Sequence, residues 1–142
     1  MKVESDWTNP PDLEIKRILK VVRRIAVVGL SSNPVRPSFE VAKFLQSKGY
    51  EIIPINPNEI EVLEKKAYPS LSSVSGPIDL IDCFRRSDVV GETVEEGLSL
   101  GIKNFWLQEG VRDLSHGRVV CQKGGFIIMD RCIAKEYTRL MR

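Results

Sequence analysis

The chain has 142 residues, of which 42% are hydrophobic and 28% are charged, and its formal net charge is +2. A chain of this length folds as one domain with a sizeable buried core. The small net charge and the lack of a lysine- or arginine-rich block argue against nucleic-acid binding. The apolar runs are shorter than the roughly 20 residues that cross a bilayer, and the N-terminal stretch does not resemble a signal peptide. We therefore expect a cytoplasmic protein that associates with neither nucleic acid nor membrane.

The first half of the sequence predicts a helix and a strand, followed by a second helix and strand. Apolar residues recur at helical spacing over residues 10–22, and Asn9 is placed to cap that helix. A short β-branched strand follows over residues 24–30, and a second helix is expected over residues 37–48. The next strand covers residues 50–57, which read YEIIPINP.

The middle of the sequence contains a long connection before the third strand. Residues 59–66 are highly charged and predict a short helix, whereas residues 68–77 are rich in turn-forming serine and proline. The third strand is expected over residues 78–84. Ser87 is placed to cap the following helix, which Gly101 ends.

The last part of the sequence repeats this alternation, with strands expected over residues 103–107 and 125–129 and helices over residues 113–123 and 131–141. Alternating strands and helices form right-handed crossovers, and strands that are apolar throughout indicate a sheet covered on both faces. We predict an α/β fold: a Rossmann-like, doubly wound, mostly parallel five-stranded sheet with helices on both faces.

The N-terminal helix precedes this repeating pattern. We expect residues 1–23 to pack as a helix on the domain that residues 24–142 form, so that the whole chain is a single domain. Because this helix is amphipathic, it covers either the sheet or a second subunit. Whether the protein forms a homo-oligomer therefore stays open.

The loops after the predicted strands are rich in hydroxyl, amide and guanidinium groups. In an open parallel sheet these loops lie at one edge, where ligands bind near the switch point in strand order. All three groups donate hydrogen bonds to anionic oxygen, and a helix N-terminus after the first loop favours an anion by about 0.3–1 kcal/mol. A phosphate-bearing nucleotide is therefore the expected ligand. The simpler interpretation makes the serines and asparagines turn formers and the arginines solvated surface charges.

The loop after the first strand does not fit a nicotinamide dinucleotide. It has one glycine, Gly29, where the dinucleotide fingerprint has three. The ribose of NAD binds an acidic residue at the end of the second strand, where this chain has Asn56. No arginine adjoins Asn56 to bind the additional phosphate of NADP. Both cofactors are therefore disfavoured.

Five stretches at the strand ends together resemble the small, single-domain CoA-binding proteins. They are VVGLSSNPVRPS, IIPINP, DLIDCFRR, GIKNFWLQEGV and MDRC, and the resemblance extends over residues 24–140. The chain is similar in this to the CoA-binding domain of the succinyl-CoA synthetase alpha subunit. The resemblance implies a Rossmann-like fold whose strand ends bind coenzyme A or an acyl-CoA.

The resemblance also implies which strand end contacts which part of the cofactor. The phosphates are expected at Gly29, Ser31, Ser32, Asn33, Pro34, Arg36 and Ser38. The nucleotide end is expected at Ile55, Asn56 and Pro57, and the adenosine and pyrophosphate at Phe84, Arg85 and Arg86. The pantetheine arm is expected at Leu107, Gln108 and Glu109.

The three cysteines, Cys83, Cys121 and Cys132, are scattered, and with a single histidine in the chain they argue against a structural zinc site. Cys83 and Cys121 lie in apolar stretches and are expected to be core thiols. Cys132 follows the fifth strand at a helix start beside Arg131, which favours a reactive thiol at the ligand edge. Two interpretations of Cys132 stay open: a packed, inert residue, or a thiol that forms a mixed disulfide with bound CoA.

The sequence shows no complete catalytic arrangement. The synthetases use a phosphorylatable histidine in a further domain, to which no part of this sequence corresponds. The single histidine, His116, is expected on an exposed helix away from the strand ends, and no Ser-His-Asp or Cys-His arrangement is visible. We therefore expect a non-catalytic cytosolic CoA-binding protein: a carrier or sensor of CoA, or a redox partner of its thiol. The alternatives are a CoA- or nucleotide-dependent enzyme (an acyl-CoA ligase-type subunit or an NAD(P)-linked oxidoreductase) and a regulatory partner with a vestigial site.

Overall fold

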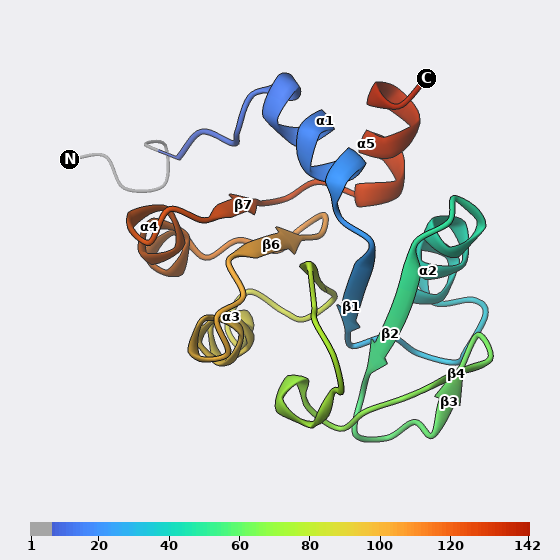
Figure 1. Ribbon diagram of the computed structural model, residues 1–142. Helices are drawn as coiled ribbons and strands as arrows, with labels where there is room; N and C mark the ends of the chain where they lie inside the picture. Colours follow the sequence, from blue (N-terminus) through green and yellow to red (C-terminus); the bar gives the residue numbers. More distant parts are fainter. Residues whose placement is uncertain (1–6) are drawn as a thin grey trace.

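The computed structural model describes residues 7–142, and five parallel strands form its central sheet (Figure 1). The strands lie in the order β2, β1, β5, β6, β7, which confirms the predicted doubly wound α/β sheet. Because β2 lies on one side of β1 and β5 on the other, the switch point is between the carboxyl ends of β1 and β5. The strands are β1 (Arg24–Val28), β2 (Glu51–Ile55), β5 (Leu80–Cys83), β6 (Asn104–Leu107) and β7 (Phe126–Ile128).

Helices cover both faces of the sheet because successive strand residues, which point to opposite faces, are mostly apolar on both. The buried Asp82 of β5 is an exception in the middle of the sheet. Ile25, Val27 and Trp106 face α1, α2 and α5, whereas Ile81 and Phe105 face α3 and α4. Figure 1 shows these two groups of helices on opposite sides of the sheet. The helices are α1 (Asp12–Val21), α2 (Pro37–Ser47), α3 (Val90–Ser99), α4 (Leu114–Gln122), α5 (Ile133–Leu140) and the short 3-10 helix η2 (Leu71–Ser73).

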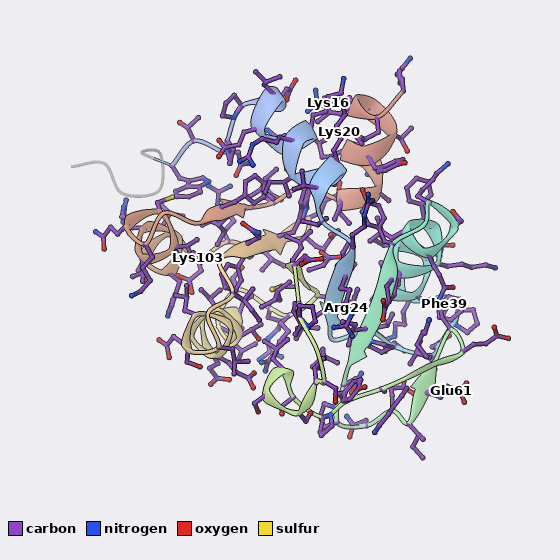
Figure 2. The ribbon with its side chains drawn as sticks, in the orientation of Figure 1. Lys16, Lys20, Arg24, Phe39, Glu61 and Lys103 are labelled. Carbon is purple, nitrogen blue, oxygen red and sulfur yellow. The ribbon has the colours of Figure 1, made fainter. Side chains whose placement is uncertain are left out.

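The N-terminal helix α1 packs its apolar side into the same core as the sheet. Ile15, Ile18 and Leu19 are buried there. Lys16 and Lys20 lie on the outer side of the helix (Figure 2). The amphipathic pattern of the sequence therefore corresponds to a helix that covers the sheet.

The predicted cap of α1 is wrong. The residue before the helix is Pro11, and no side chain caps it. The Asn9 side chain instead pairs with the backbone just after β7. Its Nδ2 donates to the Met129 carbonyl and its Oδ1 accepts from the Met129 N–H, both at 2.9 Å. The Trp7 indole N–H donates to the same Oδ1 at 3.0 Å. Asn9 thus satisfies two backbone groups at the end of a strand, where each would otherwise need another partner.

Residues 61–66 form a β-hairpin, so the short helix predicted over residues 59–66 is wrong. Leu63 and Glu64, at its tip, have φ angles of 54° and 64°, in the left-handed region. Tertiary contacts outweigh helix propensity here, because Val62 is buried in the core and Gln46 Nε2 of α2 donates to the Leu63 carbonyl at 3.2 Å. The hairpin strands are β3 (Glu61–Val62) and β4 (Lys65–Lys66).

Replacing Glu64 by glycine is expected to raise the free energy of unfolding by about 0.5–1 kcal/mol, because a side chain at positive φ crowds the neighbouring carbonyl. Urea denaturation of Glu64→Gly measures this gain. Glu61→Gly is the control, since Glu61 lies in β3, where glycine should lower stability by a similar amount. Equal losses in the two variants would contradict strain at Glu64.

Ser87 does not cap α3, contrary to the prediction. The helix begins after Val89 without a side-chain cap. The Ser87 hydroxyl accepts from the Arg112 N–H at 2.9 Å and donates to the Gly110 carbonyl at 3.3 Å. Ser87 therefore holds the loop after β5 against the loop after β6, at the carboxyl edge of the sheet.

Residues 7–142 contain neither a membrane-crossing helix nor a cluster of metal ligands. No helix there is long and apolar enough to cross a bilayer. No three His, Cys, Asp or Glu residues in that range are grouped so that they could hold a metal ion.

Candidate functional site

The switch point is built around Gly29, the residue that follows β1. Its φ is +88°, and a Cβ there would lie 2.6 Å from the Phe84 carbonyl oxygen, so only glycine fits. The Gly29 N–H donates to the Ile55 carbonyl at 2.8 Å, and the Phe84 N–H donates to the Val28 carbonyl at 2.9 Å. The carboxyl ends of β1, β2 and β5 are therefore held together with no side chain between them.

The loop after Gly29 is shaped by its own hydroxyl and amide groups. Ser31 Oγ accepts from the Asn33 N–H at 3.0 Å, and Asn33 Oδ1 accepts from the Val35 N–H at 3.1 Å. Ser38 Oγ, at the start of α2, accepts from the Ser31 N–H at 3.1 Å. These are bonds of turn-forming residues, and each hydroxyl also has a hydrogen to donate.

A carboxylate from the segment before β3 occupies part of this loop. Glu59 Oε2 accepts from the Ser32 N–H at 2.8 Å and from its hydroxyl at 3.0 Å. A phosphate oxygen accepts hydrogen bonds from the same kinds of donor. Arg36, the residue before α2, is exposed and has no ion-pair partner within residues 7–142. The loop therefore offers a phosphate two things: the Arg36 guanidinium, which has no ion-pair partner within residues 7–142, and the Ser32 donors, which bind the Glu59 carboxylate.

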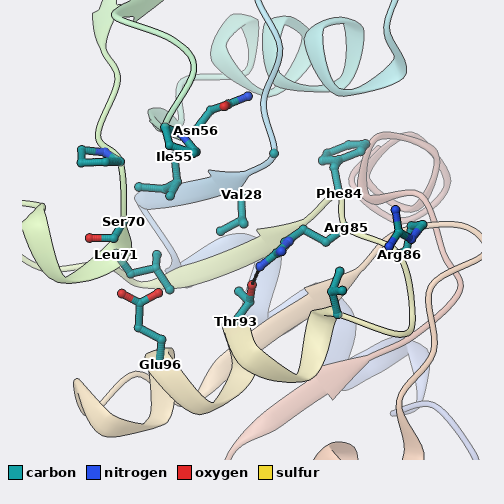
Figure 3. A pocket seen from close by; sticks show the side chains of 14 residues that line it. Val28, Ile55, Asn56, Ser70, Leu71, Phe84, Arg85, Arg86, Thr93 and Glu96 are labelled. Atoms are coloured by element: carbon teal, nitrogen blue, oxygen red, sulfur yellow. Dashed lines mark hydrogen bonds between the residues drawn. The ribbon is translucent and has the colours of Figure 1, made fainter.

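A hollow of about 500 Å³ opens beside the switch point (Figure 3). Its volume lies within the roughly 300–1,000 Å³ of small-molecule and cofactor sites. The structure brings the ends of β1, β2 and β5 together around it, as the strand order requires. The predicted residues that line it are Gly29, Ile55, Asn56, Pro57, Phe84, Arg85 and Arg86.

One wall of this first hollow was missed by the sequence analysis. It consists of residues 69–71, in the connection before β5, and of Thr93 and Glu96 on α3. The Asn56 N–H donates to the Tyr68 carbonyl at 2.9 Å and so holds the connection beside the end of β2. The strand order could have indicated the part of this wall that residues 69–71 form, because the connection from β2 to β5 has to pass β1 and the switch point.

Two arginines follow β5 and point in different directions. Arg85 reaches across the hollow, where its Nη1 donates to the Thr93 hydroxyl at 3.2 Å and lies 3.8 Å from the Glu92 carboxylate (Figure 3). The Arg86 side chain is 78% exposed, and its Nε lies 3.0 Å from Asp88 Oδ1. An ion pair this exposed contributes little to stability, so Arg86 is free to exchange Asp88 for an anionic ligand.

A second hollow, of about 420 Å³, adjoins the first. Phe84, Arg85 and Arg86 line both hollows, which therefore lie side by side along the carboxyl edge. Such an arrangement suits an elongated ligand. The predicted residues Gln108, Glu109 and Cys132 also line the second hollow, together with Pro37, Val41, Gly110 and Val111.

Several predicted residues border neither hollow. Leu107 is fully buried in the core on the α3 and α4 face, so its side chain does not reach the edge. Gln108 does line the second hollow, but it is also buried, and its Oε1 accepts from the Ile133 N–H at 3.3 Å and so positions the start of α5. The residues of the first loop that line neither hollow are Ser31, Ser32, Asn33, Pro34, Arg36 and Ser38.

The carboxylates near the second hollow are bound by neighbouring groups. Glu109 lies 3.0 Å from the Lys135 ammonium. Asp130, with a left-handed φ of 60°, accepts from the Gly110 N–H at 2.7 Å and lies 3.6 Å from the Arg112 guanidinium. Asp130 thereby ties the end of β7 to the loop after β6.

The three cysteines have different surroundings. Cys83 is fully buried in β5, where burial raises the pKa of its thiol, which confirms the predicted core thiol. Cys121 is exposed on α4, so its prediction as a core thiol is wrong: it lies on the outer side of that helix. Cys132 directly precedes α5, is 9% exposed and lines the second hollow.

His116 is not the exposed histidine that the sequence predicted. Its Nδ1 lies 2.8 Å from the Asp113 carboxylate, and its Nε2 lies 2.7 Å from the Glu95 carboxylate on α3. Hydrogen bonding to Glu95, partly opposed by burial, raises the pKa of the imidazole. Asp113 also caps α4 by accepting from the His116 N–H at 3.0 Å. His116 therefore links α3 to α4 and borders neither hollow.

The chain has relatives among known sequences. It is 46% identical over 125 residues to the uncharacterized protein YneT of Bacillus subtilis (strain 168), covering 88% of this chain and 93% of that protein. It is 33% identical over 95 residues to the ADP-forming acetate–CoA ligase II of Archaeoglobus fulgidus, covering 66% of this chain and 14% of the ligase. The chain is thus similar to one whole small protein and to a small part of a ligase.

A solved structure and a family model agree with these matches. A hypothetical protein from Pyrococcus horikoshii OT3 superposes with a TM-score of 0.88 at 31% identity, covering 100% of this chain and 98% of that chain. That structure confirms the predicted Rossmann-like fold, and the ligase match together with the family model confirms the resemblance to CoA-binding proteins. A model described as "CoA binding domain" matches residues 23–138, a range that includes every strand end around the two hollows. The chain belongs to the CoA binding domain family.

Proposed function

We propose that the carboxyl edge of the sheet binds coenzyme A or an acyl-CoA, and that the protein is a non-catalytic carrier or sensor of CoA in the cytoplasm. The observation that carries this proposal is the pair of hollows joined at Phe84, Arg85 and Arg86, in a chain of the CoA binding domain family. Coenzyme A is elongated, with phosphates toward one end and a thiol at the other. The edge has the cations Arg85 and Arg86 where the two hollows meet, and the Cys132 thiol in the second hollow.

The contacts of Asn56 favour CoA over NAD. Asn56 Nδ2 donates to the Leu30 carbonyl at 3.0 Å, and its Oδ1 accepts from the Asn58 N–H at 2.9 Å. The amide therefore closes the turn after β2, at the position where NAD-binding sheets present a carboxylate to the ribose. CoA binding does not require a carboxylate at this position.

The carboxylates at the edge support a role without catalysis. Proton transfer requires a group within hydrogen-bond reach of the substrate, and covalent catalysis requires a nucleophile with an adjacent base. Glu109 forms an exposed ion pair with Lys135, Asp130 binds the Gly110 N–H and Arg112, and neither hollow is lined by the one histidine, His116, that could serve as a base. A subunit of an acyl-CoA ligase is the alternative, because one relative is an acetate–CoA ligase. Formation of acetyl-CoA from acetate, ATP and CoA by the purified protein would favour that alternative.

Calorimetric titration with CoA, dephospho-CoA and NAD tests the proposed ligand. We expect CoA to bind most tightly, dephospho-CoA more weakly, and NAD barely at all. CoA at 100 times its Kd should raise the free energy of unfolding by about 2.7 kcal/mol, and the melting temperature by several degrees.

Arg36→Ala and Arg86→Ala should weaken CoA binding without changing the melting temperature of the free protein. Lys20→Ala, on the outer side of α1, is the control. Equal binding of NAD and CoA would overturn the proposal.

Glu59→Gln is expected to tighten CoA binding about three- to tenfold, since removing one repulsive charge near a phosphate is worth about 1 kcal/mol in water and more near a protein surface. The Glu59 carboxylate competes with that phosphate for the Ser32 donors. Calorimetric titration at low salt measures the change. Glu61→Gln is the matched control, because it removes the same charge two residues away, on β3. An affinity unchanged by Glu59→Gln would place the phosphates away from Ser32.

Cys132 is expected to form a mixed disulfide with CoA when the protein meets CoA disulfide. Its thiolate attacks one sulfur of that disulfide, the protein–CoA bond forms, and the other CoA leaves as a thiolate, so no outside oxidant is needed. Intact-mass measurement should show one added CoA, lost in Cys132→Ser and retained in Cys121→Ser. Cys121 is the exposed control. If no CoA is added, or if the added CoA is lost in Cys121→Ser and not in Cys132→Ser, then Cys132 is a packed, inert thiol.

A further inference from the structure

A third concavity, of about 820 Å³, lies between α2 and α5. Its inner wall is apolar and consists of Val41 and Phe44 of α2 together with Cys132 and Ala134. All four side chains are buried or half-buried. Phe44 is held by an edge-on contact with Tyr137 of α5, with ring centroids 5.7 Å apart. Polar and charged side chains surround this inner wall: Glu40, Lys43, Ser47, Lys135 and Thr138.

This α2–α5 groove is continuous with the candidate CoA site. Val41 and Cys132 line both the groove and the second hollow. A ligand that runs along the carboxyl edge and ends beside Cys132 therefore has its end at the mouth of the groove. In an acyl-CoA, the acyl group is attached to the thiol sulfur at that end. The groove is thus placed where the acyl group of such a ligand would continue.

We propose that the α2–α5 groove binds the acyl chain of an acyl-CoA, so that the preferred ligand carries an apolar chain; this inference rests on the proposed CoA site. From Val41 to Ser47, the α2 wall is about 9 Å long, at about 1.5 Å per helical residue. A wall of that length covers a short or medium acyl chain and leaves the end of a longer one in solvent. The polar rim suits a chain that lies along the surface with one side exposed.

Calorimetric titration with CoA, acetyl-CoA, butyryl-CoA and hexanoyl-CoA tests the groove in the full chain. Each methylene that is fully buried should tighten binding about fourfold, and partial burial should give a smaller but steady gain from acetyl to hexanoyl. Ala134 lines the groove but neither hollow, so Ala134→Phe should remove the gain with chain length and leave the affinity for CoA unchanged. Val119→Phe, on the partly exposed face of α4, is the matched control.

The outcomes separate this inference from the proposed function. If CoA itself does not bind, the proposed function fails. If CoA binds and the affinity does not rise with chain length, the groove is not an acyl site. If sedimentation also shows a dimer that Ala134→Phe dissociates, a second copy of the chain covers the groove and the inference is overturned. A gain with chain length that persists in Ala134→Phe would place the acyl group elsewhere.

Discussion

Asp82→Asn is expected to remove the contribution by which the buried Asp82 carboxyl lowers the free energy of unfolding as the pH rises above about 4. Asp82 lies in the middle of the sheet, between Val27 of β1 and Trp106 of β6. It is fully buried, and neither carboxylate oxygen has a hydrogen-bond partner within residues 7–142. Burial therefore raises the pKa of this carboxyl well above its ordinary value of 3.8.

The sign of the effect follows from which state holds the proton. Between the ordinary pKa and the raised pKa, the unfolded chain has an ionised Asp82, whereas the folded protein keeps the proton. Unfolding therefore releases a proton, and the free energy of unfolding falls by up to about 1.4 kcal/mol for each pH unit in this window. Asparagine has nearly the same shape and does not titrate, so the advantage of the variant grows with pH.

Urea denaturation of the wild type and Asp82→Asn from pH 4 to pH 8 measures this difference. The control is Asp88→Asn in the loop after β5, where hydrogen bonding to Arg86 lowers the pKa of Asp88. That variant should lose a weak stabilisation toward neutral pH, the opposite direction. Parallel pH profiles for the wild type and Asp82→Asn would show that Asp82 is ionised in the folded protein.

Gly29→Ala is expected to lower the free energy of unfolding by about 2–4 kcal/mol, from backbone strain and overpacking together, and to weaken CoA binding. The new Cβ would lie 2.6 Å from the Phe84 carbonyl oxygen and 3.3 Å from its carbon. Phe84 cannot yield alone, because its N–H donates to the Val28 carbonyl at 2.9 Å. The ends of β1 and β5 would therefore separate, and both hollows share the displaced Phe84.

Gly101→Ala is the matched control for that variant. Gly101 has a φ of +86°, nearly that of Gly29, but a Cβ there meets no atom within 4 Å. Gly101→Ala should therefore lose only about 1–2 kcal/mol of stability, from the strain of a side chain at positive φ, and it should bind CoA as the wild type does. Urea denaturation and calorimetric titration compare the two. Equal losses would mean that the contact with Phe84 relaxes at no cost.

The sheet was predictable because each of its strands is a short apolar run bounded by turn residues, a pattern that depends on local sequence. The hairpin at residues 61–66 was not predictable in this way. Its charged residues favour a helix locally, and only the burial of Val62 and the bond from Gln46 to Leu63 select the hairpin. Asn9 and Ser87 were likewise mistaken for caps, because their partners, Met129 and the loop after β6, are distant in sequence.

The candidate site was predictable only in part, for a similar reason. The ends of parallel strands share one edge, so the residues after β1, β2, β5 and β6 could be grouped from the strand order alone. The wall formed by residues 69–71 and by Thr93 and Glu96 depends on the path of a long connection and on the face of a helix. The hydrogen bonds that Ser32 donates to the Glu59 carboxylate could not be predicted once residues 59–66 were assigned to a helix.

A crystal structure of the protein with coenzyme A tests the central claim most directly. We predict that the pantetheine arm lies in the second hollow, with its sulfur beside Cys132, and that the phosphates lie near Arg36 and Arg86. Phe84 should stand between the two halves of the ligand, since it lines both hollows. Coenzyme A bound at any other surface, with both hollows empty, would contradict the claim.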